Sequence, residues 1–312
     1  MGSGHGHSHG HGHSLGMTAT GRHRKRLLIV LAITGTVFVA EVIGGLLSGS
    51  LALLADAGHM LTDSTGLLLA VLGASLATRA ATARRTFGLQ RAEVLAALAN
   101  ALLLVAISVW VLIQAVDRLR APTEIETGLM LGVAIAGAVA NLIGLLVLRR
   151  GQAESLNVRG AYLEVLGDLV GSVAVIIAAI LITLTGWTRF DAIASLVIFL
   201  LILPRAWSLL REVVDVLLEA TPRGVDLDEV RDHILGLPQV VDVHDLHAWT
   251  ITSGVPVLSA HVIVDERCIA EGRTGEVLHG LAECLGGHFD VEHCTFQIEP
   301  VGHREHEFDH HP

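Results

Sequence analysis

The sequence predicts a membrane α-helical protein, a six-transmembrane-helix bundle followed by a small cytoplasmic α+β domain. Three observations lead to this fold class. Hydrophobic residues make up 52% of the 312 residues and charged residues only 17%, and the mean hydropathy is +0.60. Charges are sparse between residues 27 and 210 and dense at both ends. Because soluble globular proteins and disordered chains carry more charge, these values exclude both classes.

Apolar stretches long enough to cross a bilayer define the predicted spans. About 20 residues are needed for a helix to cross a hydrocarbon core of roughly 30 Å. No cleavage site follows the first stretch, so it is predicted to be a membrane helix and not a signal peptide. The predicted spans are Leu27–Leu47, Leu51–Leu76, Ala92–Val116, Gly128–Leu148, Ala161–Gly186 and Asp191–Leu209.

Basic residues in the short loops predict the orientation. Most of them precede the first span or lie between spans two and three and between spans four and five, whereas the opposite loops hold Arg118, Arg120 and Arg189. Positively charged loops stay in the cytoplasm, so both termini are predicted to be cytoplasmic. The excess of arginine over lysine favours a bacterial source. We therefore expect a multi-pass protein of the bacterial inner membrane.

After residue 220 the pattern changes to that of a soluble domain. Helical and alternating segments follow in the order αββαβ, a ferredoxin-like type of α+β domain. About 80 residues bury only a modest core, so we expect two copies to pair as a homodimer. Three scattered cysteines, Cys268, Cys284 and Cys294, favour a reduced compartment. The predicted segments are Val225–Leu237, Val240–Thr250, Val255–Val264, Thr274–Leu285 and Val291–Ile298.

The two ends of the chain complete the predicted domain organisation. This organisation is a His-rich cytoplasmic arm at residues 1–26, a transmembrane domain at 27–220, the cytoplasmic domain at 221–300 and a polar tail at 301–312. Histidine alternating with Gly and Ser is typical of a metal-binding arm without a packed core. An affinity tag is the alternative, although tags are usually contiguous. The predicted capture residues are His5, His7, His9, His11 and His13.

Ionisable residues inside two spans predict the transport site. Each costs roughly 2.5–3.5 kcal/mol or more in a membrane helix. The second span carries Asp56, His59 and Asp63 on one helical face, and the fifth span carries Glu164 and Asp168 with the same i, i+4 spacing. One imidazole and three carboxylates suit a tetrahedral divalent cation, with zinc first and cobalt or cadmium next. The predicted ligands are His59, Asp63, Glu164 and Asp168.

Proton exchange follows from the same set of ligands. Buried carboxylates that lie near one another bind protons when the metal leaves, so metal and protons compete for one site. Three further polar residues, Glu41, Asp56 and Asn141, are expected to orient a ligand or line the access path for the cation. The alternative is that such residues only make hydrogen bonds between membrane helices.

Three runs of sequence resemble the cation diffusion facilitator family, in its bacterial zinc, cadmium and cobalt efflux branch. They are GSLALLADAGHMLTD from Gly49 to Asp63, NVRGAYLEVLGD from Asn157 to Asp168, and HDLHAW from His244 to Trp249. The resemblance covers the chain from about Arg26 to Pro300. It implies a homodimer that exports divalent metal from the cytoplasm in exchange for protons by alternating access, with the transport site made by spans two and five.

The resemblance also implies particular ligands. The family's paired motifs fall on the four transport residues, with Glu164 in place of the commoner His or Asp, which widens the expected metals to include iron and manganese. Regulatory metal positions of the cytoplasmic domain fall on His244, His261 and Glu299. Alternation along the last strand places His293 on the same face as Glu299. The alternative is that the histidines of the HDLHAW run are structural. Gln90 stands where a loop histidine is frequent, so no loop metal site is predicted.

Two other functions fit the composition less well. A zinc-dependent intramembrane enzyme is disfavoured, because none of the six predicted spans contains an HExxH or GxSxG pattern. A membrane-anchored metal sensor does not need costly charges in the middle of its spans. The net charge of −10 argues against nucleic acid as a partner. The expected partners are therefore divalent metal ions, protons and the lipid bilayer, with Zn2+ as the metal and no organic cofactor.

Overall fold

The computed structural model describes residues 19–149, 156–252, 254–289, 291 and 293–306. The chain divides into two compact units. The first unit comprises Met1–Leu61 and Ala106–Leu203. The second comprises Thr62–Val105 and Pro204–Pro312, and it contains the cytoplasmic domain. The five predicted capture histidines of the His-rich arm lie outside the described residues, whereas residues 19–26, predicted to belong to that arm, are the first residues of a helix.

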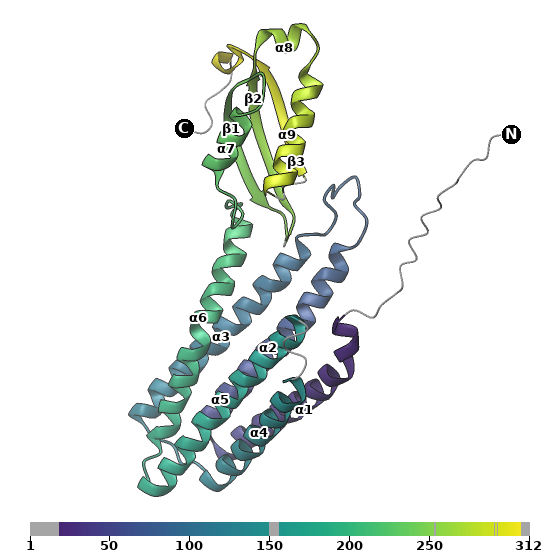
Figure 1. Ribbon diagram of the computed structural model, residues 1–312. Helices are drawn as coiled ribbons and strands as arrows, with labels where there is room; N and C mark the ends of the chain where they lie inside the picture. The colour runs from purple at the N-terminus through teal and green to yellow at the C-terminus, as the bar shows by residue number, and fades with distance from the viewer. Residues whose placement is uncertain (1–18, 150–155, 253, 290, 292, 307–312) are drawn as a thin grey trace, which may run out of the picture. The chain divides into compact units, whose positions relative to one another are not determined.

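Six long helices confirm the predicted membrane fold (Figure 1). Each is long and apolar enough to cross a membrane. The sixth helix continues past the predicted end at Leu209, because hydropathy marks only its apolar part while the helix runs on with a polar sequence. The helices are α1 (Ala19–Ser48), α2 (Leu51–Ala77), α3 (Ala92–Arg120), α4 (Thr127–Leu148), α5 (Leu156–Thr185) and α6 (Arg189–Leu217).

Helices α1, α4 and α5 pack together in the first unit. Their shared apolar core contains Val30 of α1, Leu145 and Leu148 of α4, and Val158 and Val165 of α5. Many large apolar side chains point outward from these helices and remain exposed. Such a pattern is typical of helices whose surroundings are lipid, since lipid tails are as apolar as the side chains.

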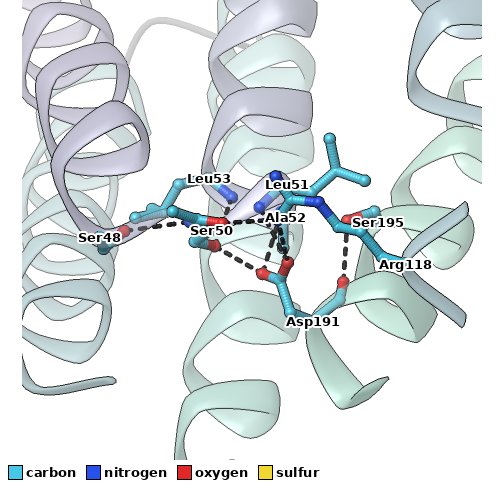
Figure 2. A network of polar contacts seen from close by, with 9 residues as sticks. Ser48, Ser50, Leu51, Ala52, Leu53, Arg118, Asp191 and Ser195 are labelled. Atoms are coloured by element: carbon cyan, nitrogen blue, oxygen red, sulfur yellow. Dashed lines mark hydrogen bonds and ion pairs between the residues drawn. The ribbon is translucent and has the colours of Figure 1, made fainter. Parts of the chain in front are cut away.

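The start of α2 is held by a carboxylate from another helix (Figure 2). Asp191, in the first turn of α6, is fully buried. It accepts hydrogen bonds from Ser50 Oγ at 2.6 Å and from the backbone N–H groups of Leu51 at 2.8 Å and Ala52 at 3.1 Å. Ser50 Oγ in turn accepts from Leu53 N–H at 3.2 Å. The first N–H groups of a helix have no partner within it, so α6 supplies the partner that α2 lacks.

An arginine completes this network. Arg118 Nη1 of α3 lies 3.2 Å from the Asp191 carboxylate and donates to the Gly49 carbonyl oxygen at 2.5 Å. Gly49 has a φ of 73°, a conformation that glycine adopts without the cost of a Cβ atom. Helices α2, α3 and α6 are thereby joined at one buried point, which we call the Asp191 anchor (Ser50, Leu51, Ala52, Arg118 and Asp191).

The cytoplasmic domain confirms the predicted αββαβ order, with one short additional helix before the second long one. Strand β1 pairs antiparallel with β2, and β2 pairs parallel with β3. The predicted polar tail begins with a 3-10 helix at His303–His306. The elements are α7 (Leu227–Leu235), β1 (Val240–Thr250), β2 (Pro256–Val264), α8 (Glu266–Ala270), α9 (Thr274–Phe289) and β3 (His293–Pro300) (Figure 1).

The two faces of this sheet have different surroundings. Core residues of the strands, such as Val243, Ala260 and Val262, pack with apolar side chains of α7 and α9. Neighbouring residues along a strand point to opposite faces. His244 and His261 therefore belong to the face that α7 and α9 do not cover, which we call the open face of the sheet.

Candidate metal sites

Four helices of the first unit contribute to a buried polar cluster. Glu41 of α1 is 1% exposed, Asp56 of α2 is 2% exposed and Asp168 of α5 is 6% exposed. Asn141 of α4 and Ser172 of α5 are also buried. We call these five residues the membrane polar cluster.

Two glycines bring the members of the membrane polar cluster together. A Cβ atom at Gly171 of α5 would overlap the Asp56 carboxylate, so this carboxylate lies directly against the α5 backbone. A Cβ atom at Gly137 of α4 would lie 3.0 Å from Glu41 Oε1 and 3.3 Å from Ser172 Oγ. Small residues allow membrane helices to approach closely, and here they admit polar side chains between helices.

The cluster contains polar atoms that the protein does not satisfy. Within the described part of the chain, both carboxylate oxygens of Glu41, Oδ2 of Asp56 and both side-chain polar atoms of Asn141 have no hydrogen-bond partner. A buried carboxylate without partners is costly in its charged form. Such a group is stabilised either by a proton or by a cation, which makes the cluster chemically suited to both.

The predicted ligands of α2 lie one turn apart on that helix. His59 belongs to the first unit and Asp63 to the second, and both side chains are half-buried. Asp63 Oδ2 forms an ion pair with Arg205 Nη1 of α6 at 3.2 Å. Sequence reasoning missed Arg205, although an arginine inside a predicted span signals that an acidic partner is required.

The predicted ligands of α5 differ in their exposure. Asp168 is buried, whereas Glu164, one turn earlier, is exposed. The i, i+4 spacing places both on one side of the helix. The complete set of four transport ligands remains a prediction.

The open face of the cytoplasmic sheet carries a cluster of two histidines and a glutamate. His244 of β1 and His261 of β2 are direct partners across the antiparallel pair. Glu299 of β3, 1% exposed, joins them: its Oε2 lies 3.0 Å from His244 Nε2 and its Oε1 lies 2.8 Å from His261 Nδ1. Ligand atoms from all three lie within 4.8 Å of one another. We call these residues the open-face cluster.

Neighbouring side chains support this cluster. Gln297 Nε2 donates to Glu299 Oε1 at 2.9 Å. Burial by itself would raise the pKa of Glu299, but the hydrogen bond from His244 and the charge of His261 outweigh it, so the pKa lies below its ordinary value. The carboxylate is thus held in the ionised form that a metal ligand requires.

A bulge in β1 brings in a residue that sequence reasoning missed. The register shifts between His244 and His247, and Asp245 adopts a φ of 48°. Its Oδ1 lies 2.9 Å from His247 Nε2 and its Oδ2 lies 3.8 Å from His261 Nε2. Bulges often re-aim side chains beside functional sites. The position of Asp245 between two histidines in HDLHAW was the available signal.

The prediction that His293 belongs to the metal site of the cytoplasmic domain is wrong. The structure does not bring His293 into the open-face cluster. Instead it opens β3, with its ring 5.4 Å from that of Phe87. Alternation correctly assigns the face, but six residues of strand separate His293 from Glu299, which corresponds to about 20 Å.

Comparisons with known proteins match both parts of the chain. Residues 27–218 match the family described as the cation efflux transmembrane domain, and residues 222–301 match the cytoplasmic domain of cation efflux proteins. The chain is 47% identical over 271 residues to the metal cation efflux system protein CzcD of Cupriavidus metallidurans, covering 87% of this chain and 85% of that protein.

Two further relatives and one solved structure are similar. The zinc transporter ZitB of Escherichia coli is 43% identical over 276 residues, covering 88% of this chain and 87% of ZitB. The cadmium, cobalt and zinc/H(+)-K(+) antiporter of Bacillus subtilis is 38% identical over 273 residues, covering 87% of each chain. The metal-bound C-terminal domain of CzcD from Cupriavidus metallidurans matches at 44% identity with a TM-score of 0.22, covering 24% of this chain and 99% of that domain.

Proposed function

The chain belongs to the cation efflux family, the cation diffusion facilitators, and from this premise we propose that it exports divalent metal, zinc first, from the cytoplasm in exchange for protons. Membership makes it a multi-pass membrane transporter and not an enzyme. It also disfavours a sensor in which the spans serve only as an anchor. Relatives named for zinc, and for cadmium, cobalt and zinc with protons, support this choice of substrates.

The membrane polar cluster is the observation that carries the proposal. Glu41, Asp56 and Asp168 bring three carboxyl groups from three helices into a buried region. Buried charges there are costly, and Glu41 and Asp56 have carboxylate oxygens without a hydrogen-bond partner among the described residues, so these carboxyl groups are occupied either by protons or by a cation. Metal entry then displaces protons, and proton entry displaces metal. Exchange of the two is the direct consequence.

We assign coordination of the transported ion to His59, Asp63, Glu164 and Asp168. One imidazole and three carboxylates form a hard donor set that accepts zinc, cobalt and cadmium. Asp63 exchanges its ion pair with Arg205 for the metal, so Arg205 balances the carboxylate when the metal has left. Asp56, Glu41 and Asn141 line the path for the cation and protons beside the ligands.

The remaining parts have supporting roles in this proposal. The protein lies in the bacterial inner membrane with both termini in the cytoplasm, and two copies pair as a homodimer. His244, His261 and Glu299 hold a regulatory zinc ion in the cytoplasmic domain. Their nitrogen and carboxylate oxygen donors suit zinc, and the ligand atoms of all three lying within 4.8 Å of one another supports this assignment. The N-terminal histidines His5 to His13 capture metal near the membrane.

Zinc uptake into inside-out vesicles under an imposed proton gradient tests this function. Wild-type protein should accumulate zinc, and uptake should fall as the pH on the cytoplasmic side is lowered, because protons then compete for the ligands. His59→Ala and Asp168→Ala should each reduce uptake at least about 10-fold. Asp117→Asn changes an exposed acid of α3 and serves as the control. Wild-type uptake in both ligand variants would contradict the site, and uptake independent of pH would contradict proton exchange.

A further inference from the structure

A second group of metal-binding side chains lies on the helical side of the cytoplasmic domain, across the sheet from the open-face cluster. It contains His233 of α7 together with Cys284 and His288 of α9. Each residue offers one ligand atom, and these atoms lie within 4.8 Å of one another. Both helices pack over the same apolar core. The position of His233 is therefore fixed relative to those of Cys284 and His288.

The distances match those of a coordinated metal. Cys284 Sγ lies 3.6 Å from His233 Nδ1, and the rings of His233 and His288 have centroids 4.9 Å apart. Zinc bonds of about 2.3 Å to sulfur and about 2.0–2.1 Å to nitrogen, meeting at a tetrahedral angle, place sulfur and nitrogen about 3.6 Å apart. The observed separation is that of two ligands on one tetrahedral ion.

A hydrogen bond orients the third ligand. His288 Nδ1 lies 2.9 Å from the carbonyl oxygen of Cys284, one helical turn earlier. A carbonyl oxygen can only accept, so Nδ1 carries the proton and Nε2 carries the lone pair. Metal-binding histidines commonly hold their second nitrogen in this way, which fixes both the tautomer and the ring orientation.

We propose that His233, Cys284 and His288 form a metal site for a soft or borderline divalent cation, Zn2+, Cd2+ or Co2+, with solvent as the fourth ligand. One thiolate and two imidazoles select these ions over Mn2+ and Mg2+, which prefer oxygen donors. Binding releases the thiol proton to solvent. The exposure of His288 leaves room for the water ligand. This site does not depend on the transport proposal, because its ligands lie outside the membrane helices.

Cobalt absorption of the full-length protein in detergent provides the first test. A thiolate bound to Co2+ gives a charge-transfer band in the near ultraviolet, which sites made only of His, Asp and Glu do not give. Wild type should show this band, and Cys284→Ala should lose it. Cys294→Ala and Cys268→Ala are the matched controls and should keep it. Retention of the band in Cys284→Ala, or its absence in wild type, would overturn the proposal.

Protection of the thiol provides a second test that does not require removal of Cys284. Zinc should slow alkylation of Cys284 by a maleimide, followed peptide by peptide with mass spectrometry. His233→Ala and His288→Ala should each weaken this protection more than 10-fold in zinc concentration, since even the loss of a supporting partner costs 10–100-fold. His279→Ala, an exposed histidine of the same helix, should behave as wild type. Equal protection in all three variants would show that the contacts are packing only.

Discussion

Two buried acids of the first unit, Asp191 and Asp56, differ in their hydrogen-bond partners. Asp191, beside the start of α2, has both carboxylate oxygens occupied by N–H, O–H and guanidinium donors. Asp56, on α2 itself, is equally buried but has one oxygen without a partner among the described residues. A buried charge that is fully paired contributes to structure, whereas one left unpaired is available to a proton or a cation. Burial alone would not separate these roles.

Removal of Asp191 should have the largest effect on stability. Asp191→Ala leaves Arg118 and two helix N–H groups without their carboxylate, and breaking a buried ion pair costs about 3–5 kcal/mol. The free energy of unfolding, measured with denaturant on purified protein, should fall by that amount. Asp117→Ala, an exposed acid on α3, should change it by less than about 0.5 kcal/mol. Equal stability of the two variants would show that the Asp191 anchor does not stabilise the protein.

The next effect concerns the space beside Asp56. Gly171→Ala places a Cβ atom against the Asp56 carboxylate and should cost about 1–3 kcal/mol of stability. Gly167→Ala, one turn earlier on α5, meets nothing within 4 Å and should stabilise the helix by up to about 1 kcal/mol. Thermal unfolding of both variants measures the difference. If both shift in the same direction, Asp56 does not lie against α5 as described.

Ser50→Ala should lower the free energy of unfolding by less than Asp191→Ala does. Ser50 Oγ both donates to Asp191 and accepts from Leu53 N–H, and loss of a helix-capping hydroxyl costs about 1 kcal/mol. Ser50→Thr keeps the hydroxyl and should retain most of the stability. The measurement is again the free energy of unfolding. A loss as large for Ser50→Thr as for Ser50→Ala would mean that packing, and not the hydrogen bonds, matters there.

The variants Asp56→Asn and Glu41→Gln should have the smallest effect on stability, although they should impair transport. Asp56→Asn and Glu41→Gln remove a charge without changing shape, and because part of each carboxylate is unpaired, the free energy of unfolding should stay the same or rise. Zinc uptake into vesicles should nevertheless fall at least about 10-fold. Destabilisation comparable with that of Asp191→Ala would show that the membrane polar cluster is structural.

Local patterns predicted most of the fold. Stretches of apolar residues identified the six spans, and alternation identified β1 over the same residues that the structure gives. Partners distant in the chain could not be predicted in this way. Asp191 reaches Ser50 across 141 positions and Arg205 reaches Asp63 across 142, and no spacing rule encodes which helices meet.

The candidate sites show the same difference between what local patterns predict and what depends on contacts distant in the chain. The pairing of His244 with His261 and Glu299 came from the family resemblance, whereas Asp245 depends on a bulge with a positive φ that its sequence does not require. His293 failed because alternation gives the side of a strand and not the distance along it. His233 and Cys284 lie on different helices, so their proximity is visible only once α7 and α9 are packed.

The Asp191 anchor also fixes the first residues of α2, so any tilt of this helix turns about that end. His59 lies eight residues from Leu51, which at 1.5 Å per residue is an arm of about 12 Å. A tilt of about one degree about the fixed end would move His59 by about 0.2 Å, and coordination distances in metal sites tolerate about that much. The rigidity of a contact at the end of the helix therefore sets the angular tolerance within which His59, as a ligand of the proposed transport site, would hold an ion.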